Sequence, residues 1–197
     1  RTTSSAASDV YKRQKLDQVI DYIDKNSSFV SQVTLYPYLK TRAGTQHPKL
    51  FENEKFLNSL RISRWHIYIS CVNDMSIFIA SICAKDYDYS NIKAYKLAKY
   101  LSSTIFKKIK QNDIDDSEFH LSVKNISKIY KGLILNQITK REVLFKKSAD
   151  DLIKWAPVSE QFKKEDETIL RNSINFRWIP IRTVSYTHLR AHETDRH

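Results

Sequence analysis

The chain has 197 residues, a length that suits one domain with a sizeable core, and its two glycines and four prolines are too few for a fold with many tight turns. Its two cysteines, Cys71 and Cys83, lie in an apolar run without C-x-x-C spacing, which favours small buried side chains over a disulfide or zinc ligands. The formal net charge of +11 allows nucleic acid or an anionic surface as a partner, although the lysine-rich usage of an AT-rich genome predicts the same charge without one.

The two ends of the chain lack the patterns of the rest. Neither SSAASDVYKRQ at residues 4–14 nor VSYTHLRAHET at residues 184–194 shows helical periodicity, strand alternation or a capping signal. Both resemble translated tagmentation sequencing adapters. The resemblance implies a metagenomic source and ends, 1–14 and 184–197, that are adapter-derived and disordered or adventitiously structured. Residues 15–183 are then the natural domain or a fragment of one, and the histidines near the C-terminus are no metal site.

Two segments precede the first loop. Apolar residues at helical spacing predict a helix over residues 15–26, and Ser27 or Ser28 is suited to cap the element that follows. That element, residues 29–41, fits a helix or a strand by its apolar pattern, and Pro37 disfavours the middle of either. We expect a helix.

The loop at residues 41–48 is the first candidate site. Gly44 suits the position just after a helix, and Pro48 suits the first turn of the next one. Basic and hydroxyl side chains gather there, where free backbone N–H groups and the helix dipole favour an anion. Ordinary capping with a solvated arginine is the alternative interpretation. The candidate anion-binding residues are Lys40, Arg42, Thr45 and His47.

An uninterrupted pattern from residue 48 to about residue 85 predicts one long helix. Its second half is nearly all apolar and long enough to span a membrane, but His66, Asn73 and Asp74 fall inside it. A central aspartate costs about 2.5–3.5 kcal/mol on insertion scales. We therefore expect no membrane span, and an all-α fold, a single irregular bundle around this long buried helix.

A polar stripe runs along the predicted central helix. The simpler interpretation is a solvated strip with a few hydrogen-bonded core residues. The alternative is one wall of an enzyme pocket, with His66 and Asp74 as an acid and base and Glu52 as a second carboxylate. Two helical turns, about 12 Å, separate His66 from Asp74, so a substrate or another helix must bridge them. The stripe consists of Glu52, Lys55, Ser59, Ser63, His66, Ser70, Asn73 and Asp74.

Four more helices are predicted, over residues 91–111, 117–138, 148–156 and 159–178. Asp151 lies at the capping-box offset from Ser148 at the start of the third. A lysine row opposite the core side of the first helix is a candidate for nonspecific nucleic-acid binding, although such rows are usually solvated faces. The row consists of Lys93, Lys96, Lys99, Lys107 and Lys110.

No nucleotide-binding, hydrolase, zinc or di-iron motif occurs in the sequence, so we expect neither a cofactor nor a metal. The pattern favours a cytoplasmic, bacterial helical protein that binds an anion at the loop around Arg42 and His47. A small-molecule enzyme and a nucleic-acid-binding protein remain the alternatives, which leaves an anionic small molecule or nucleic acid as the expected partner.

Overall fold

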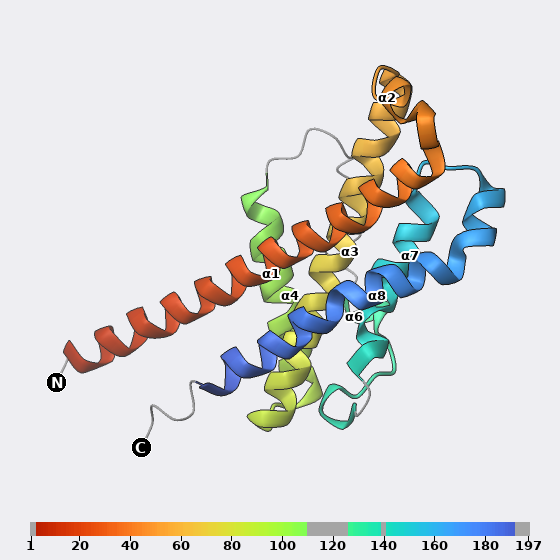
Figure 1. Ribbon diagram of the computed structural model, residues 1–197. Helices are drawn as coiled ribbons and strands as arrows, with labels where there is room; N and C mark the ends of the chain where they lie inside the picture. The colour runs from red at the N-terminus through yellow and green to blue at the C-terminus, as the bar shows by residue number, and fades with distance from the viewer. Residues whose placement is uncertain (1–2, 110–125, 139–140, 192–197) are drawn as a thin grey trace.

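The computed structural model describes the backbone of residues 3–109, 126–138 and 141–191, and the side chains of residues 14–109, 128–138 and 143–185. Every regular element in these ranges is a helix, and the helices pack around one central helix, α3 (Figure 1). The predicted all-α bundle is confirmed. The helices are α1 (Thr3–Ala43), α2 (His47–Leu50), α3 (Glu54–Asp86), α4 (Asn91–Lys108), α6 (Ile126–Ile129), α7 (Lys146–Trp155) and α8 (Glu160–Ala191), with 3₁₀ helices at Gly44–Gln46, Leu135–Gln137 and Arg141–Phe145.

Helix α3 forms the centre of the core. Every residue from 66 to 82 is buried, and α1, α4 and α7 pack directly against the helix. By length and composition, α3 is the one helix of the described residues that could cross a membrane, with a mean hydropathy of 1.6 over its most apolar window. Within the bundle, 94% of that window is buried, as expected for the core helix of a helical domain.

The central helix begins later than the sequence predicts. The four residues of α2 end at Leu50, and α3 starts at Glu54 after a turn. Asn53 is the N-cap of α3: its backbone is extended, and its side-chain oxygen accepts a hydrogen bond from the N–H of Phe56 at 3.2 Å. An asparagine N-cap can begin a new helix without a glycine or proline before it. The lack of those residues after Pro48 therefore wrongly indicated one uninterrupted helix.

Helix α1 is continuous where two helices are predicted. Ser27 is buried in the middle of the helix and does not cap a second one. The neighbouring Ser31 and Thr34 donate their hydroxyl hydrogens to carbonyls one turn back, at 2.9 and 2.7 Å. Because these polar groups are satisfied within the helix, they do not interrupt it. The chain also stays helical through Pro37, whose ring is exposed.

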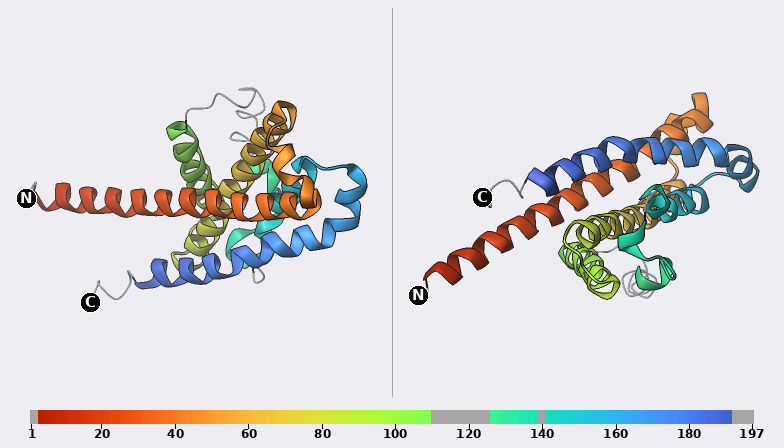
Figure 2. Two further views of the ribbon diagram at one scale, coloured as in Figure 1. Left: turned by 45° about the horizontal axis from the view of Figure 1, so that its top comes forward. Right: turned by 90° about the horizontal axis from the view of Figure 1, so that it is seen from below.

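Helices α1 and α8 form an antiparallel pair along one side of the bundle (Figure 2). Tyr22 donates its hydroxyl to the carbonyl of Ile181 at 3.0 Å, and near the other end Tyr38 donates to Asp166 at 3.0 Å. Helix α8 extends beyond the predicted end at residue 178 and runs through Pro180. Both terminal segments continue these helices, α1 back to Thr3 and α8 on to Ala191. Their resemblance to adapters stays a prediction.

The region after α3 follows the predicted pattern in part. Helix α4 ends at Lys108, close to the predicted end, and Ser90 caps its start by accepting from the N–H of Lys93 at 3.3 Å. The predicted helix over 117–138 falls partly outside the described residues. Its described part is α-helical only over α6; Gly132, with φ of +90°, lies in the turn that follows, and a short 3₁₀ helix comes after it. A helix to residue 138 was therefore wrong.

Candidate functional site

The polar stripe of α3 faces α7. Ser63 donates its hydroxyl to the carbonyl of Trp155 at 2.5 Å, at the C-terminus of α7. Two turns further along α3, Ser70 donates to the carboxylate of Asp151, which is 6% exposed and also accepts from Lys147 at 2.5 Å. The two helices therefore run antiparallel, with hydroxyl and carboxylate groups bonded between them. This part of the stripe is a hydrogen-bonded core contact.

Asp74 caps the N-terminus of α7 from a neighbouring helix. Its carboxylate accepts a hydrogen bond from the backbone N–H of Ser148 at 2.7 Å, and no part of the residue is exposed. The Phe145 side chain at the N-cap position makes no capping bond, so this carboxylate supplies the acceptor that the local sequence lacks. Asp151 does not complete a capping box with Ser148, because it bonds to Ser70 and Lys147.

Burial raises the pKa of Asp74 well above the ordinary value for an aspartate. The bond from Ser148 acts in the opposite direction, because it stabilises the charged form. The nearby Asp151 carboxylate raises the pKa of Asp74 further, and Lys147 lowers it. Asp74 is therefore a structural group at a helix N-terminus whose pKa lies above that of an ordinary aspartate.

The three predicted acid–base residues do not converge on a described pocket. His66 stacks on Trp155, with ring centroids 3.5 Å apart and an angle of 2° between the planes. Asp74 lies further along α3 at the start of α7, and Glu52 is exposed in the turn before α3. Neither the pocket at the start of α3 nor the one between α1, α3 and the end of α4 includes any of the three.

Arg42, the main cation of the predicted anion site, binds a carboxylate of the chain itself. Two of its three nitrogens donate to Asp166 of α8, one of them Nε at 2.5 Å from Oδ2, and its guanidinium lies 4.5 Å from the ring centroid of Phe162. Tyr38 donates to the same carboxylate. These bonds lower the pKa of Asp166, with Arg42 the largest cause. The fork geometry that favours a bound anion is thus used to join α1 to α8.

The rest of the predicted anion loop offers little to a ligand. Gly44, with φ of +52°, is where the prediction placed it, just after α1, and Pro48 lies in the first turn of α2. However, α2 has only four residues, too few to build a significant dipole at its N-terminus. The His47 ring packs against Phe51 with centroids 4.7 Å apart, and Lys40 and Thr45 are exposed.

The predicted lysine row lies on an exposed face of α4. Lys93, Lys96, Lys99 and Lys107 are exposed, while Lys110 is outside the described residues. Lys93 lies over the ring of Tyr89, with Nζ 3.6 Å from the centroid. This placement suits the solvated face that such rows usually form, and binding of nucleic acid by it stays a prediction.

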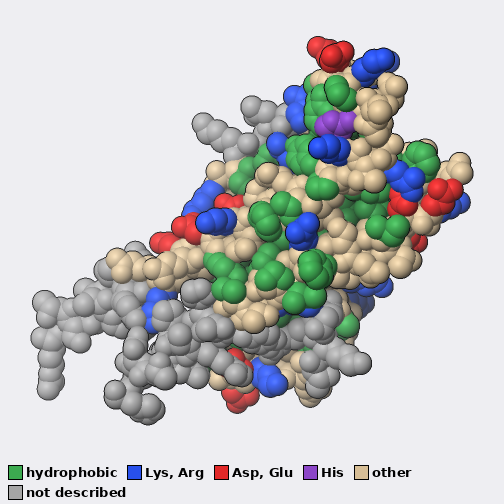
Figure 3. All heavy atoms as spheres, viewed as in Figure 1, with side chains coloured by type: hydrophobic (Ala, Val, Ile, Leu, Met, Phe, Trp, Pro, Cys, Tyr) green, Lys and Arg blue, Asp and Glu red, His purple; other side chains and the backbone are tan. Residues whose placement is uncertain are grey.

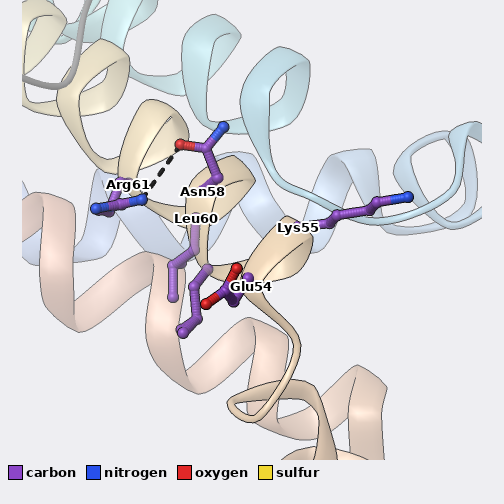
Figure 4. Close-up of a pocket in the computed structure, with 6 residues that line it drawn as sticks. Glu54, Lys55, Asn58, Leu60 and Arg61 are labelled. Carbon is purple, nitrogen blue, oxygen red and sulfur yellow. Dashed lines mark hydrogen bonds between the residues drawn. The ribbon is translucent and has the colours of Figure 1, made fainter.

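The larger described pocket is a shallow surface hollow at the start of α3 (Figure 4). Its volume is about 680 Å³, and its lining comes from a single stretch of α3, residues 54–61. Arg61 is bonded to Asn58 at 3.4 Å, and the Lys55 side chain extends away from the other labelled side chains. A hollow whose lining comes from one helix does not surround a ligand, so this pocket is a poor candidate.

The second pocket lies between α1, α3 and the end of α4 and has a volume of about 300 Å³. Its floor holds a bonded pair: the Tyr68 hydroxyl donates to Asp24 at 2.6 Å. Burial, and then the bond to Asp24, raise the pKa of Tyr68, so the phenol stays a donor. Arg64 lines the same pocket next to Trp65, with its guanidinium 5.8 Å from the indole ring centroid. The lining comprises Asp24, Ser28, Ser31, Gln32, Arg64, Trp65, Tyr68 and Ile109.

This pocket is the feature that sequence reasoning missed. Its lining comes from α1, α3 and the end of α4, and no compact motif marks it, since Asp24 and Arg64 are 40 residues apart in the numbering. Within the described ranges, no group of three or more histidine, cysteine or acidic side chains could hold a metal ion. Comparisons with protein families, with curated proteins and with solved structures find no match for this chain.

Proposed function

We propose that this chain binds a small molecule that carries both an anionic and a cationic group, in the pocket between α1, α3 and α4. The observation that carries the proposal is that Arg64 lies in the pocket without a carboxylate partner among the described residues. This half-buried residue lines the pocket, and across the described part of the chain it forms no ion pair. Its planar fork of N–H donors matches a carboxylate or phosphate, so an anionic ligand supplies the acceptor that the described residues do not.

Asp24 supports the second half of the proposal. One of its oxygens accepts from Tyr68, and this bond fixes the carboxylate at the floor of the pocket. Asp24 and Arg64 have opposite charges and line the same pocket, yet they form no ion pair with each other. A ligand with an ammonium group and a carboxylate separated by a short linker bridges such a pair.

The remaining lining fits a ligand of this kind. Trp65 offers an apolar wall, and Ser28, Ser31 and Gln32 of α1 add short hydroxyl and amide groups. Pockets for small molecules combine apolar walls with a few placed polar groups, and about 300 Å³ is the lower end of their size range. An α-amino acid or a molecule of similar size is therefore the ligand class that we propose.

A binding function agrees with the expectation from the sequence, but the site moves from the loop at Arg42 to Arg64. Arg42 already has Asp166 as its partner, whereas Arg64 has no carboxylate partner among the described residues. A reducing, cytoplasmic location remains part of the proposal and is supported by two free thiols, Cys71 and Cys83.

The test is a thermal-shift screen of the purified chain with the standard amino acids, their decarboxylated amines and simple dicarboxylates. A ligand at ten times its Kd stabilises the folded state by about 1.4 kcal/mol, which raises the Tm by about 3–6 °C for a chain of this size. We expect at least one zwitterion to give such a shift, and Arg64→Gln to abolish it.

Arg61→Gln is the matched control, because Arg61 lies on the same helix and outside this pocket. It should retain the shift in full. Asp24→Asn should weaken the binding of zwitterions more than the binding of simple carboxylates. The proposal fails if no zwitterion stabilises the wild-type chain, or if Arg64→Gln and Arg61→Gln retain the same response.

A further inference from the structure

An exposed apolar band crosses the outer side of the α1–α8 pair. On α8, Phe162, Ile169 and Phe176 recur every seven residues and so follow one line along the helix. Ile169 and Phe176 are 65% and 67% exposed, unusual values for side chains of this size. In Figure 3, where α1 and α8 lie nearest the viewer, hydrophobic side chains gather over these helices. The band consists of Phe29, Phe162, Ile169, Phe176 and Ile179.

The surroundings of the band on α8 carry few charges. The exposed residues that share its side of the helix by helical spacing include Thr168, Asn172 and Asn175, and the charged ones among them are Glu165 and Arg177. The charged residues Lys164 and Arg171 lie toward the edge of the helix. A solvent-facing helix normally carries charges in these positions, so this composition is typical of a surface that another protein covers.

We infer that a second copy of this chain covers the band, in an antiparallel arrangement with two-fold symmetry. Charge complementarity favours this partner. Glu165 lies at one end of the band on α8, and the exposed Lys25 of α1 lies at the other end, next to Ile179, because Tyr22 is bonded to Ile181. A two-fold axis through the middle places Glu165 of each copy against Lys25 of the other.

The size of the band agrees with a dimer. The band runs along α8 from Phe162 to Ile179, which is about 27 Å of helix, and two adjacent helices give a width of about 20 Å. Two such faces together bury roughly 1,000 Å², which is the lower end of the range for specific interfaces and agrees with a weak dimer of micromolar Kd. A membrane surface is a poorer fit, because helices that bind lipid headgroups carry a continuous basic face, whereas on this one Lys25 and Arg177 are accompanied by Glu165 and amides.

The experiment is sedimentation equilibrium of the full chain over a range of concentrations. The wild-type chain should be a dimer at about 10 μM or above. Ile169→Glu should raise the dimer Kd at least tenfold, because it places a charge in the apolar band. Ile92→Glu is the matched control: Ile92 of α4 is 71% exposed and lies outside the band, so this variant should remain a dimer. Circular dichroism and Tm should show both variants folded.

A charge-swap cycle tests the arrangement itself. Glu165→Lys and Lys25→Glu should each weaken the dimer, and the double variant should recover much of the loss, since the opposite charges then meet again. The inference is overturned if the wild-type chain stays monomeric, or if Ile92→Glu weakens the dimer as much as Ile169→Glu. It is also overturned if a monomeric chain binds phosphatidylcholine–phosphatidylglycerol vesicles and loses that binding with Ile169→Glu, since the partner is then a membrane.

Discussion

The carboxylate of Asp74, in the middle of α3, accepts a hydrogen bond at 2.7 Å from the backbone N–H of Ser148 at the start of α7. One buried carboxyl thus joins two helices that are more than 70 residues apart in the chain. The Trp178 indole donates to the hydroxyl of the same serine at 3.3 Å, which brings α8 into the contact. Three helices therefore meet at one small polar contact.

Removing the carboxyl should destabilise the fold, and replacing it with an amide should not. Asp74→Ala leaves the buried N–H of Ser148 without an acceptor, at a cost of about 1–3 kcal/mol. Asp74→Asn keeps an acceptor oxygen in the same place. Urea unfolding should therefore show the alanine variant less stable than the asparagine variant by this amount. Equal stability of the two variants would mean that the contact with Ser148 contributes nothing.

The pH dependence of unfolding should show the titration of Asp74. Its pKa in the folded state is raised, chiefly by burial, so the folded protein holds the proton more tightly than the unfolded chain. The favourable contribution is complete below the unfolded pKa of about 3.9 and declines as the pH rises toward the folded pKa. Urea titrations across this pH range should show that the free energy of unfolding declines less with rising pH in Asp74→Asn than in the wild-type protein. An identical pH profile in both proteins would contradict the raised pKa.

The fold was predictable where the signal is local. The apolar run of α3 predicted the central helix, and Gly44 with Pro48 predicted the end of α1. Both signals depend only on residues that are close in sequence. The break at Asn53 was missed since an asparagine cap resembles any other polar residue inside a helical pattern. Residues 15–41, predicted as two helices, belong to the single helix α1. The predicted boundary was wrong because Ser27, which looked like a cap, is a buried residue inside that helix.

The candidate site was less predictable because it depends on pairing between distant helices. The sequence identified Arg42 as a cation at a loop, but the carboxylate that binds it, Asp166, is 124 residues away. Nothing in the neighbouring sequence distinguishes Arg64 from Arg61. Arg64 lies in a pocket that α1 and α4 also line, whereas Arg61 lines a hollow formed by α3 alone. Tertiary packing alone decides that, among the described residues, Arg42 has a carboxylate partner and Arg64 has none.

The contact between Arg42 and Asp166 should have the opposite pH dependence to Asp74. Arg42, followed by the bond from Tyr38, lowers the pKa of Asp166 in the folded state. Its contribution is present above the unfolded pKa and is lost as the pH falls through the lowered folded value. Acid titration followed by circular dichroism should therefore show Asp166→Asn less stable than wild type near neutral pH, and the two should approach each other in strong acid. A constant difference down to the lowest pH would contradict this linkage.

The stacked rings of His66 and Trp155 give a prediction that separates packing from catalysis. Their contact should contribute about 0.5–1.5 kcal/mol, so His66→Ala should lower the Tm by a few degrees. The emission of Trp155 should change as well, because the imidazole lies flat against the indole at 3.5 Å. His66→Phe preserves a flat aromatic ring and should restore most of the stability. If His66→Ala leaves both the Tm and the fluorescence unchanged, the stacking is not a packing contact, and the acid–base role considered for His66 regains support.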